Sequence, residues 1–214
     1  SVGIISEPNA HPVCAEESDG VARPYVAAAL NGDVDNHADL RSEEGLVVAA
    51  EITTDAKVIP ALTARRLAEG HDLDEAFRRT VAALEGSVAI GASNAVAPEK
   101  LHLALRGSGQ ALYVGLADDA YIVASEPYGL VEETHTYVRM DGETPANPEN
   151  PTASRGQVLV LDGAQAGTVE GIRRLAYDGT ELPVTEANLE VAEITTRDID
   201  RGDFPHFLLK EMTE

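Results

Sequence analysis

Seven short apolar or alternating segments follow one another between residues 87 and 177, and no helical pattern separates them. Parallel strands of one sheet need a crossover of a dozen or more residues, usually a helix, whereas antiparallel strands need only short turns. Gly, Asp and Pro clusters suited to such turns stand between the segments. The chain is therefore predicted to form largely antiparallel sheet, with strands at Ser87–Ala92, Leu101–Leu105, Leu112–Leu116, Tyr121–Ser125, Tyr137–Met140, Gln157–Leu161 and Gly171–Tyr177.

The first part of the chain is predicted to supply the helices. Apolar residues recur at three- and four-residue spacing over 73–85, where Asp72 can cap a helix and Gly86 can end it. Helices that precede a series of antiparallel strands predict an α+β fold. The other expected elements are a loop over 1–24, a buried strand at Tyr25–Leu30, helices over 35–44 and 56–69, an exposed loop at Thr144–Arg155 and a helix at Phe207–Glu214.

The charge of the chain argues against two classes of partner. Its 214 residues carry 16 Lys and Arg against 37 Asp and Glu, a formal net charge of −21. Such a surface repels a nucleic-acid backbone and an anionic membrane leaflet, so neither partner is expected. No apolar run approaches the ~20 residues of a membrane span, and no secretory signal is visible. With one cysteine, Cys14, and hence no internal disulfide, we expect a cytoplasmic protein.

The sequence gives no reason to expect a cofactor or a metal. Neither G-x-G-x-x-G nor the Walker pattern is present, so no phosphate-binding loop is predicted. The six histidines lack a regular metal-ligand spacing, and a single cysteine cannot form a cysteine-based zinc cluster.

Asn31-Gly32, directly after the predicted strand, has two interpretations. The dipeptide is typical of a type I′ hairpin turn, and this is the preferred interpretation when it is taken alone. An Asn side-chain amide and a Gly backbone N–H can also form an oxyanion hole, in which both donors point at one developing negative charge.

Asp55 and His11 also allow two interpretations each. Asp55 opens a predicted helix, where most Asp residues are caps, although its carboxylate could hold an ammonium group. His11 precedes Pro12 in a loop, and such a histidine is more often structural than catalytic.

The order of several short motifs resembles a class II glutamine amidotransferase domain, which has an N-terminal-nucleophile hydrolase fold. The resemblance covers nearly all of the chain and implies an αββα sandwich of two antiparallel sheets that lacks its first strand or strands. The motifs are Asn9-Ala10-His11-Pro12, Leu30-Asn31-Gly32, Asp39-Leu40-Arg41, Thr54-Asp55, Leu84-Glu85-Gly86-Ser87, Arg106-Gly107-Ser108, Tyr113-Val114-Gly115-Leu116 and Ala124-Ser125-Glu126.

The resemblance implies a role for each candidate site residue. Asn31 and Gly32 would form the oxyanion hole, and Asp55 would bind the α-ammonium group of L-glutamine. His11 would belong to the ordered loop under the glutamine pocket. Ser1 falls at the threonine of the family's Arg-Trp-Ala-Thr-His-Gly loop, which grips the glutamine carboxylate, so it is assigned to substrate binding. A minority alternative makes Ser1 itself an N-terminal nucleophile.

The chain departs from the family pattern at its nucleophile. The family uses an N-terminal cysteine at the start of a Cys-Gly-Ile strand, with its free α-amino group as the base. No such strand occurs in the 214 residues, and Cys14 follows the Asn-Ala-His-Pro motif, so it is no replacement. We therefore expect this chain by itself to be inactive.

The segment Asp203–Glu211 (DFPHFLLKE) indicates which branch of the family the chain resembles. It is similar to the junction toward sugar-isomerase domains in glutamine–fructose-6-phosphate aminotransferases, which make glucosamine 6-phosphate. The implied organisation is a partial type 2 glutamine amidotransferase domain over 1–196 and a junction over 197–214. Expected partners are L-glutamine, sugar-isomerase domains absent from this chain and a second copy in a homodimer. The alternative is a non-catalytic binding or scaffold module that kept the fold.

Overall fold

A computed structural model of the chain describes residues 2–107, 111–143 and 155–193 and the single residues Gly202, Pro205 and Leu209. Its larger sheet has six strands, all antiparallel, in the order β1-β2-β3-β4-β8-β9. The strands are β1 (Val13–Cys14), β2 (Val26–Gly32), β3 (Val88–Asn94), β4 (Lys100–Arg106), β8 (Gln157–Asp162) and β9 (Ile172–Ala176).

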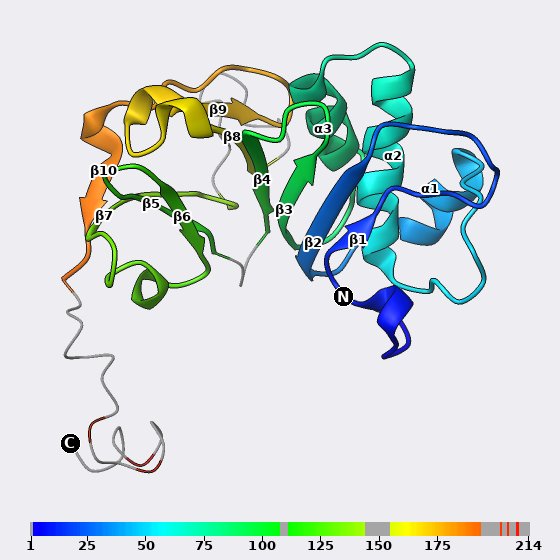
Figure 1. The fold of residues 1–214 in the computed structure, drawn as a ribbon, viewed down its shortest axis with the longest axis horizontal. Helices are drawn as coiled ribbons and strands as arrows, with labels where there is room; N and C mark the ends of the chain where they lie inside the picture. Colours follow the sequence, from blue (N-terminus) through cyan, green and yellow to red (C-terminus); the bar gives the residue numbers. More distant parts are fainter. Residues whose placement is uncertain are drawn as a thin grey trace.

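A smaller antiparallel sheet has four strands in the order β10-β7-β5-β6. Figure 1 shows it on one side of the larger sheet, with the helices on the other. The strands are β5 (Tyr113–Leu116), β6 (Tyr121–Ala124), β7 (Thr136–Arg139) and β10 (Leu189–Val191). The expected α+β fold with two antiparallel sheets is confirmed.

Three α-helices are found in the described part of the chain: α1 (His37–Glu43), α2 (Val58–Ala68) and α3 (Leu73–Ala82). Asp72 caps α3 as predicted, because its side chain accepts the Glu75 N–H. Buried residues of α2 and α3, including Ile59, Leu62 and Phe77, pack against the alternate residues of β2 and β3 that face them. None of the helices in this part is long and apolar enough to cross a membrane.

The two sheets enclose a second core. Leucines of β4 and β8 pack against small-sheet residues that include Val114 of β5 and Val138 of β7. The most central of these side chains are at most 1% exposed. Burial of apolar surface on both faces explains why β4 and β8 read as nearly continuous apolar runs.

All seven predicted strands downstream of residue 86 are present, within one or two residues of their expected ends. Two short strands were not predicted. Val13–Cys14 lies in the segment expected to be a loop and has only two residues, too few to show a pattern. Leu189–Val191 is exposed or half-buried, so it carries no apolar pattern. The tail over 197–214, apart from three single residues, and Thr144–Ser154 lie outside the described residues.

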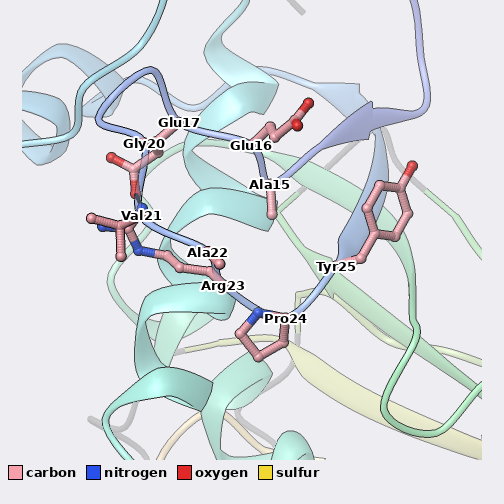
Figure 2. A pocket seen from close by; sticks show the side chains of 9 residues that line it. All are labelled: Ala15, Glu16, Glu17, Gly20, Val21, Ala22, Arg23, Pro24 and Tyr25. Atoms are coloured by element: carbon pink, nitrogen blue, oxygen red, sulfur yellow. Dashed lines mark ion pairs between the residues drawn. The ribbon is translucent and has the colours of Figure 1, made fainter.

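The segment over 15–25 is held to α2 by a buried ion pair at its centre. The Glu17 side chain is 0% exposed and bonds Arg65 Nε at 2.7 Å and Nη2 at 2.6 Å. Arg23, in the same segment, lies 3.3 Å from Glu17 Oε1. Figure 2 shows Glu17 and Arg23 beside a hollow of about 380 Å³ formed by this segment. Burial favours a protonated Glu17, but hydrogen bonds from Arg65 and from the Val47 N–H outweigh it and lower the pKa.

Glu17→Gln should therefore destabilise the fold by about 1–3 kcal/mol at pH 7, because it leaves Arg65 without its buried charged partner. The folded-state pKa of Glu17 lies below its ordinary value of 4.5. The stabilisation is therefore complete above that pH and is lost as the pH falls below it. Urea unfolding at pH 7 and pH 3 should show the difference from wild type shrinking in acid. Exposed Glu69→Gln is the control, and a loss that does not depend on pH would contradict the assignment.

Candidate active site

Asn31 and Gly32 are the last two residues of β2 and not a turn. They pair with Ala89 and Val88 of β3, so the hairpin-turn interpretation is wrong. Gly32 has a φ of +116°, and a Cβ atom there would lie 2.0 Å from the Ser87 carbonyl oxygen. Only glycine fits at this position, because any side chain would collide with the backbone of the neighbouring strand.

The ladder fixes the direction of the Gly32 N–H. Asp33 N–H donates to the Ser87 carbonyl at 3.0 Å, and hydrogen-bonded pairs alternate along an antiparallel ladder. Gly32, opposite Val88, is therefore in a non-hydrogen-bonded pair, and its N–H points away from β3. The Leu30 N–H points the same way for the same reason.

His11 contacts β2 on the side that points away from β3. Its Nδ1 accepts the Leu30 N–H at 3.3 Å, so the proton of a neutral ring lies on Nε2. The imidazole continues the β1–β2 ladder beyond the two residues of β1. It thereby holds the backbone immediately before Asn31.

Asp55 is a buried carboxylate, and the whole residue is 0% exposed. Its Oδ1 accepts the Val2 N–H at 2.9 Å and its Oδ2 accepts the Val34 N–H at 2.8 Å. Thr54, and not Asp55, caps the following turn by accepting the Ala56 N–H, so the capping interpretation of Asp55 is wrong. The carboxylate instead joins three segments that are distant in sequence.

Asn9 is a positioning residue that sequence reasoning missed. Its Oδ1 accepts the Thr53 and Thr54 N–H groups at 2.7 and 2.9 Å, and its Nδ2 donates to Ser6 Oγ and to the Glu51 carbonyl. Asn9 thereby fixes the 2–10 segment beside Asp55. The only signal was its place in the Asn-Ala-His-Pro motif, since all its partners except Ser6 lie more than 40 positions away.

A hollow of about 250 Å³ lies between these segments, lined by residues 2–6, Asn9, Ala10 and Thr54. Asn31, Gly32, His11 and Asp55 are not among its lining residues. They meet instead at the end of β2, where Asn31 and Gly32 lie within the stretch Leu30–Val34 and His11 and Asp55 accept hydrogen bonds from its two ends. Ser1 lies outside the described residues. Cys14 pairs with Ala27, four positions before Asn31 on β2, so it lies about 13 Å away along the strand. No cluster of metal-binding side chains occurs among the described residues.

Known proteins resemble this chain over almost its whole length. Glutamine–fructose-6-phosphate aminotransferase (isomerizing) of Bacillus thuringiensis subsp. konkukian is 28% identical over 213 residues, and that of Geobacillus kaustophilus is 30% identical over 214 residues. Each match covers 99% of this chain but only 30% of the relative, so the chain spans under a third of these enzymes. No protein-family model matches.

Solved structures agree on the fold. Glutamine phosphoribosylpyrophosphate amidotransferase from B. subtilis superposes with a TM-score of 0.56 at 21% identity, covering 80% of this chain and 32% of that one. A structure described as the allosteric regulatory enzyme of purine biosynthesis gives a TM-score of 0.55 at 22% identity, over 79% of this chain and 31% of that one. The chain is homologous to class II glutamine amidotransferase domains. The fold of these amidotransferases accounts for both sheets.

Gly32→Ala should cost about 3 kcal/mol or more, or prevent folding, because strain at positive φ adds to a collision with backbone. Gly91→Ala in β3 is the matched control: its Cβ would meet only Leu103 Cδ2 at 3.8 Å. Gly91→Ala should stay within about 1 kcal/mol of wild type. Urea unfolding of both variants measures the difference. Equal stability of the two would show that the end of β2 is not held as described.

Proposed function

We propose that this chain is the glutamine-binding part of a glutaminase domain. It would supply ammonia from L-glutamine for amination of fructose 6-phosphate to glucosamine 6-phosphate on sugar-isomerase domains. The observation that carries the proposal is the arrangement of one short stretch, Leu30–Val34. It contains Asn31 and Gly32, and the N–H groups at its two ends donate to His11 and Asp55. The similarity of 99% of the chain to glutamine–fructose-6-phosphate aminotransferases supports the choice of acceptor.

In this proposal Asn31 and Gly32 stabilise the tetrahedral intermediate. The Gly32 N–H points away from β3, and the exposed Asn31 side chain lies beside it. Two preorganised donors at one point can stabilise an oxyanion by several kcal/mol. His11 keeps the preceding peptide unit in place through the Leu30 N–H.

Asp55 is proposed to bind the α-ammonium group of glutamine. Its Oδ1 accepts hydrogen bonds from the Val2 N–H and from Thr54 Oγ1, and its Oδ2 accepts one from the Val34 N–H. A charge-assisted bond between this carboxylate and an ammonium group would be strong in a buried site. Ser1 is proposed to contribute to the carboxylate end of the same pocket.

The chemistry requires a thiolate that attacks the glutamine amide carbon. The oxyanion collapses to a γ-glutamyl thioester and expels ammonia, and water then releases glutamate and the thiol. Cys14, the only cysteine of the 214 residues, lies too far from Asn31 for this step. We therefore propose that a nucleophile strand beginning Cys-Gly-Ile completes the site.

A scaffold module without catalysis is the alternative, and one observation favours it. The Asp55 carboxylate is covered by the chain itself, through Val2, so that glutamine would have to displace the 2–5 segment to reach it. A scaffold module that kept the amidotransferase fold without catalysis would have no need of an open glutamine pocket.

The first test is ammonia release from L-glutamine by the 214-residue chain. We expect none, because no cysteine lies beside Asn31. Ser1→Ala and Cys14→Ala variants are the controls. Release that one of them abolishes would place the nucleophile inside this chain.

The second test uses a chain extended at its N-terminus by a Cys-Gly-Ile strand. This chain should release ammonia, and Asn31→Ala should lower turnover by about 10²–10³-fold. Ser93→Ala, at an exposed position of β3, should leave turnover unchanged. No ammonia from the extended chain would favour the scaffold alternative, and an unchanged rate in Asn31→Ala would remove Asn31 from the oxyanion hole.

A further inference from the structure

We propose that Lys57 is a positioning residue for the oxyanion donors Asn31 and Gly32. Its buried ammonium group holds β1 against the short helical turn Asp55–Lys57, so that His11, just before β1, stays in contact with the end of β2. The catalytic consequence rests on the proposed function, whereas the contacts that define the role do not.

Lys57 is a fully buried ammonium group. The residue is 0% exposed, and its Nζ donates to the Cys14 carbonyl at 2.7 Å and to the Glu16 carbonyl at 2.5 Å. Burial lowers the pKa of Lys57 below its ordinary value of 10.5, so the charge is kept here at a cost. A buried charge of this kind is expected to make hydrogen bonds that an apolar side chain could not replace.

The two carbonyls that Lys57 binds lie on the outer edge of the larger sheet. β1 is the first strand of that sheet and has only two residues. The Ala15 N–H donates to the Val26 carbonyl of β2, so the backbone groups of its neighbours Cys14 and Glu16 point away from β2. Lys57 donates to both outward carbonyls. It therefore holds the outer edge of β1 as a further strand would.

The position of β1 determines the position of His11. In the register of the β1–β2 ladder, in which Val13 stands opposite Ala28, His11 falls opposite Leu30. His11 Nδ1 accepts the Leu30 N–H there. A displacement of β1 would break this hydrogen bond and release the peptide unit that precedes Asn31.

The other end of the Leu30–Val34 stretch is held separately. Asp55 accepts the Val34 N–H, and Asn9 fixes the start of the Asp55 turn by accepting the Thr54 N–H. Loss of the Lys57 ammonium group should therefore loosen the oxyanion donors and leave the proposed ammonium site at Asp55 in place. The role predicts an effect on kcat and not on KM.

The first test compares Lys57→Met, which keeps the length of the side chain and removes its donors, with wild type in the 214-residue chain. Amide hydrogen exchange at Leu30, followed by NMR, should become about tenfold faster relative to the amides of β4. Val81→Ala, a buried change in α3, is the matched control. It should lower the melting temperature without changing that ratio. An unchanged ratio in Lys57→Met would overturn the proposal.

The wild-type chain decides the question if Lys57→Met does not fold. The ammonium protons of Lys57 should exchange slowly enough to be observed by NMR, because the group is buried and bonded. They should show nuclear Overhauser contacts to Cys14 and Glu16. Absence of these contacts would overturn the proposal.

The second test uses the chain extended by the Cys-Gly-Ile strand. Lys57→Met should lower kcat for ammonia release by about tenfold or more and leave KM for glutamine within about twofold, since small displacements of catalytic groups are costly. Val81→Ala should leave both constants near wild type, and an unchanged kcat in Lys57→Met would remove the catalytic role. If the extended wild type releases no ammonia, the glutaminase assignment falls, and the exchange ratio at Leu30 still decides whether Lys57 holds this stretch.

Discussion

The pairing of β2 with β3 over seven residues is the interaction on which the rest of the site depends. It continues through Asn31 and Gly32 because Gly32 alone can adopt φ +116° so close to the Ser87 carbonyl. The same ladder turns the N–H groups of Leu30 and Gly32 away from β3. His11 accepts the Leu30 N–H, and the Gly32 N–H is the proposed oxyanion donor. Local backbone geometry and candidate chemistry are thus set by one strand pair.

Asp55 is the second constraint. A buried carboxylate is costly unless its oxygens accept hydrogen bonds, and here Val2 and Val34 supply them. The charge therefore ties the 2–10 segment and the end of β2 to the start of α2. Asn9 reinforces this arrangement from the other side through Thr53 and Thr54. The same bonds that order the pocket also close it, and the proposed glutamine-binding role requires movement of the covering segment.

The unequal sheets connect the fold to the proposed chemistry. Sheets stabilise each other only where their faces overlap, and the small sheet leaves the inner face of β2 uncovered. That face carries Asn31. The uncovered face of β2 is therefore also the face nearest to the proposed reaction centre.

The sequence by itself determined the elements. Period-two and continuous apolar runs separated by turn residues specified eight of the strands, and the spacing of apolar residues with the Asp72 cap specified α3, because these signals are local. The sequence could not decide what Asn31-Gly32, Asp55 and His11 do. Asn-Gly favours a turn in isolation, and Asp before a helix favours a cap. The tertiary structure overrode both preferences, since β3 extends the ladder past Asn31, while Asp55 and His11 bond groups 21 and 19 positions away. Contacts at that distance depend on how the sheets and helices pack, which no local pattern encodes.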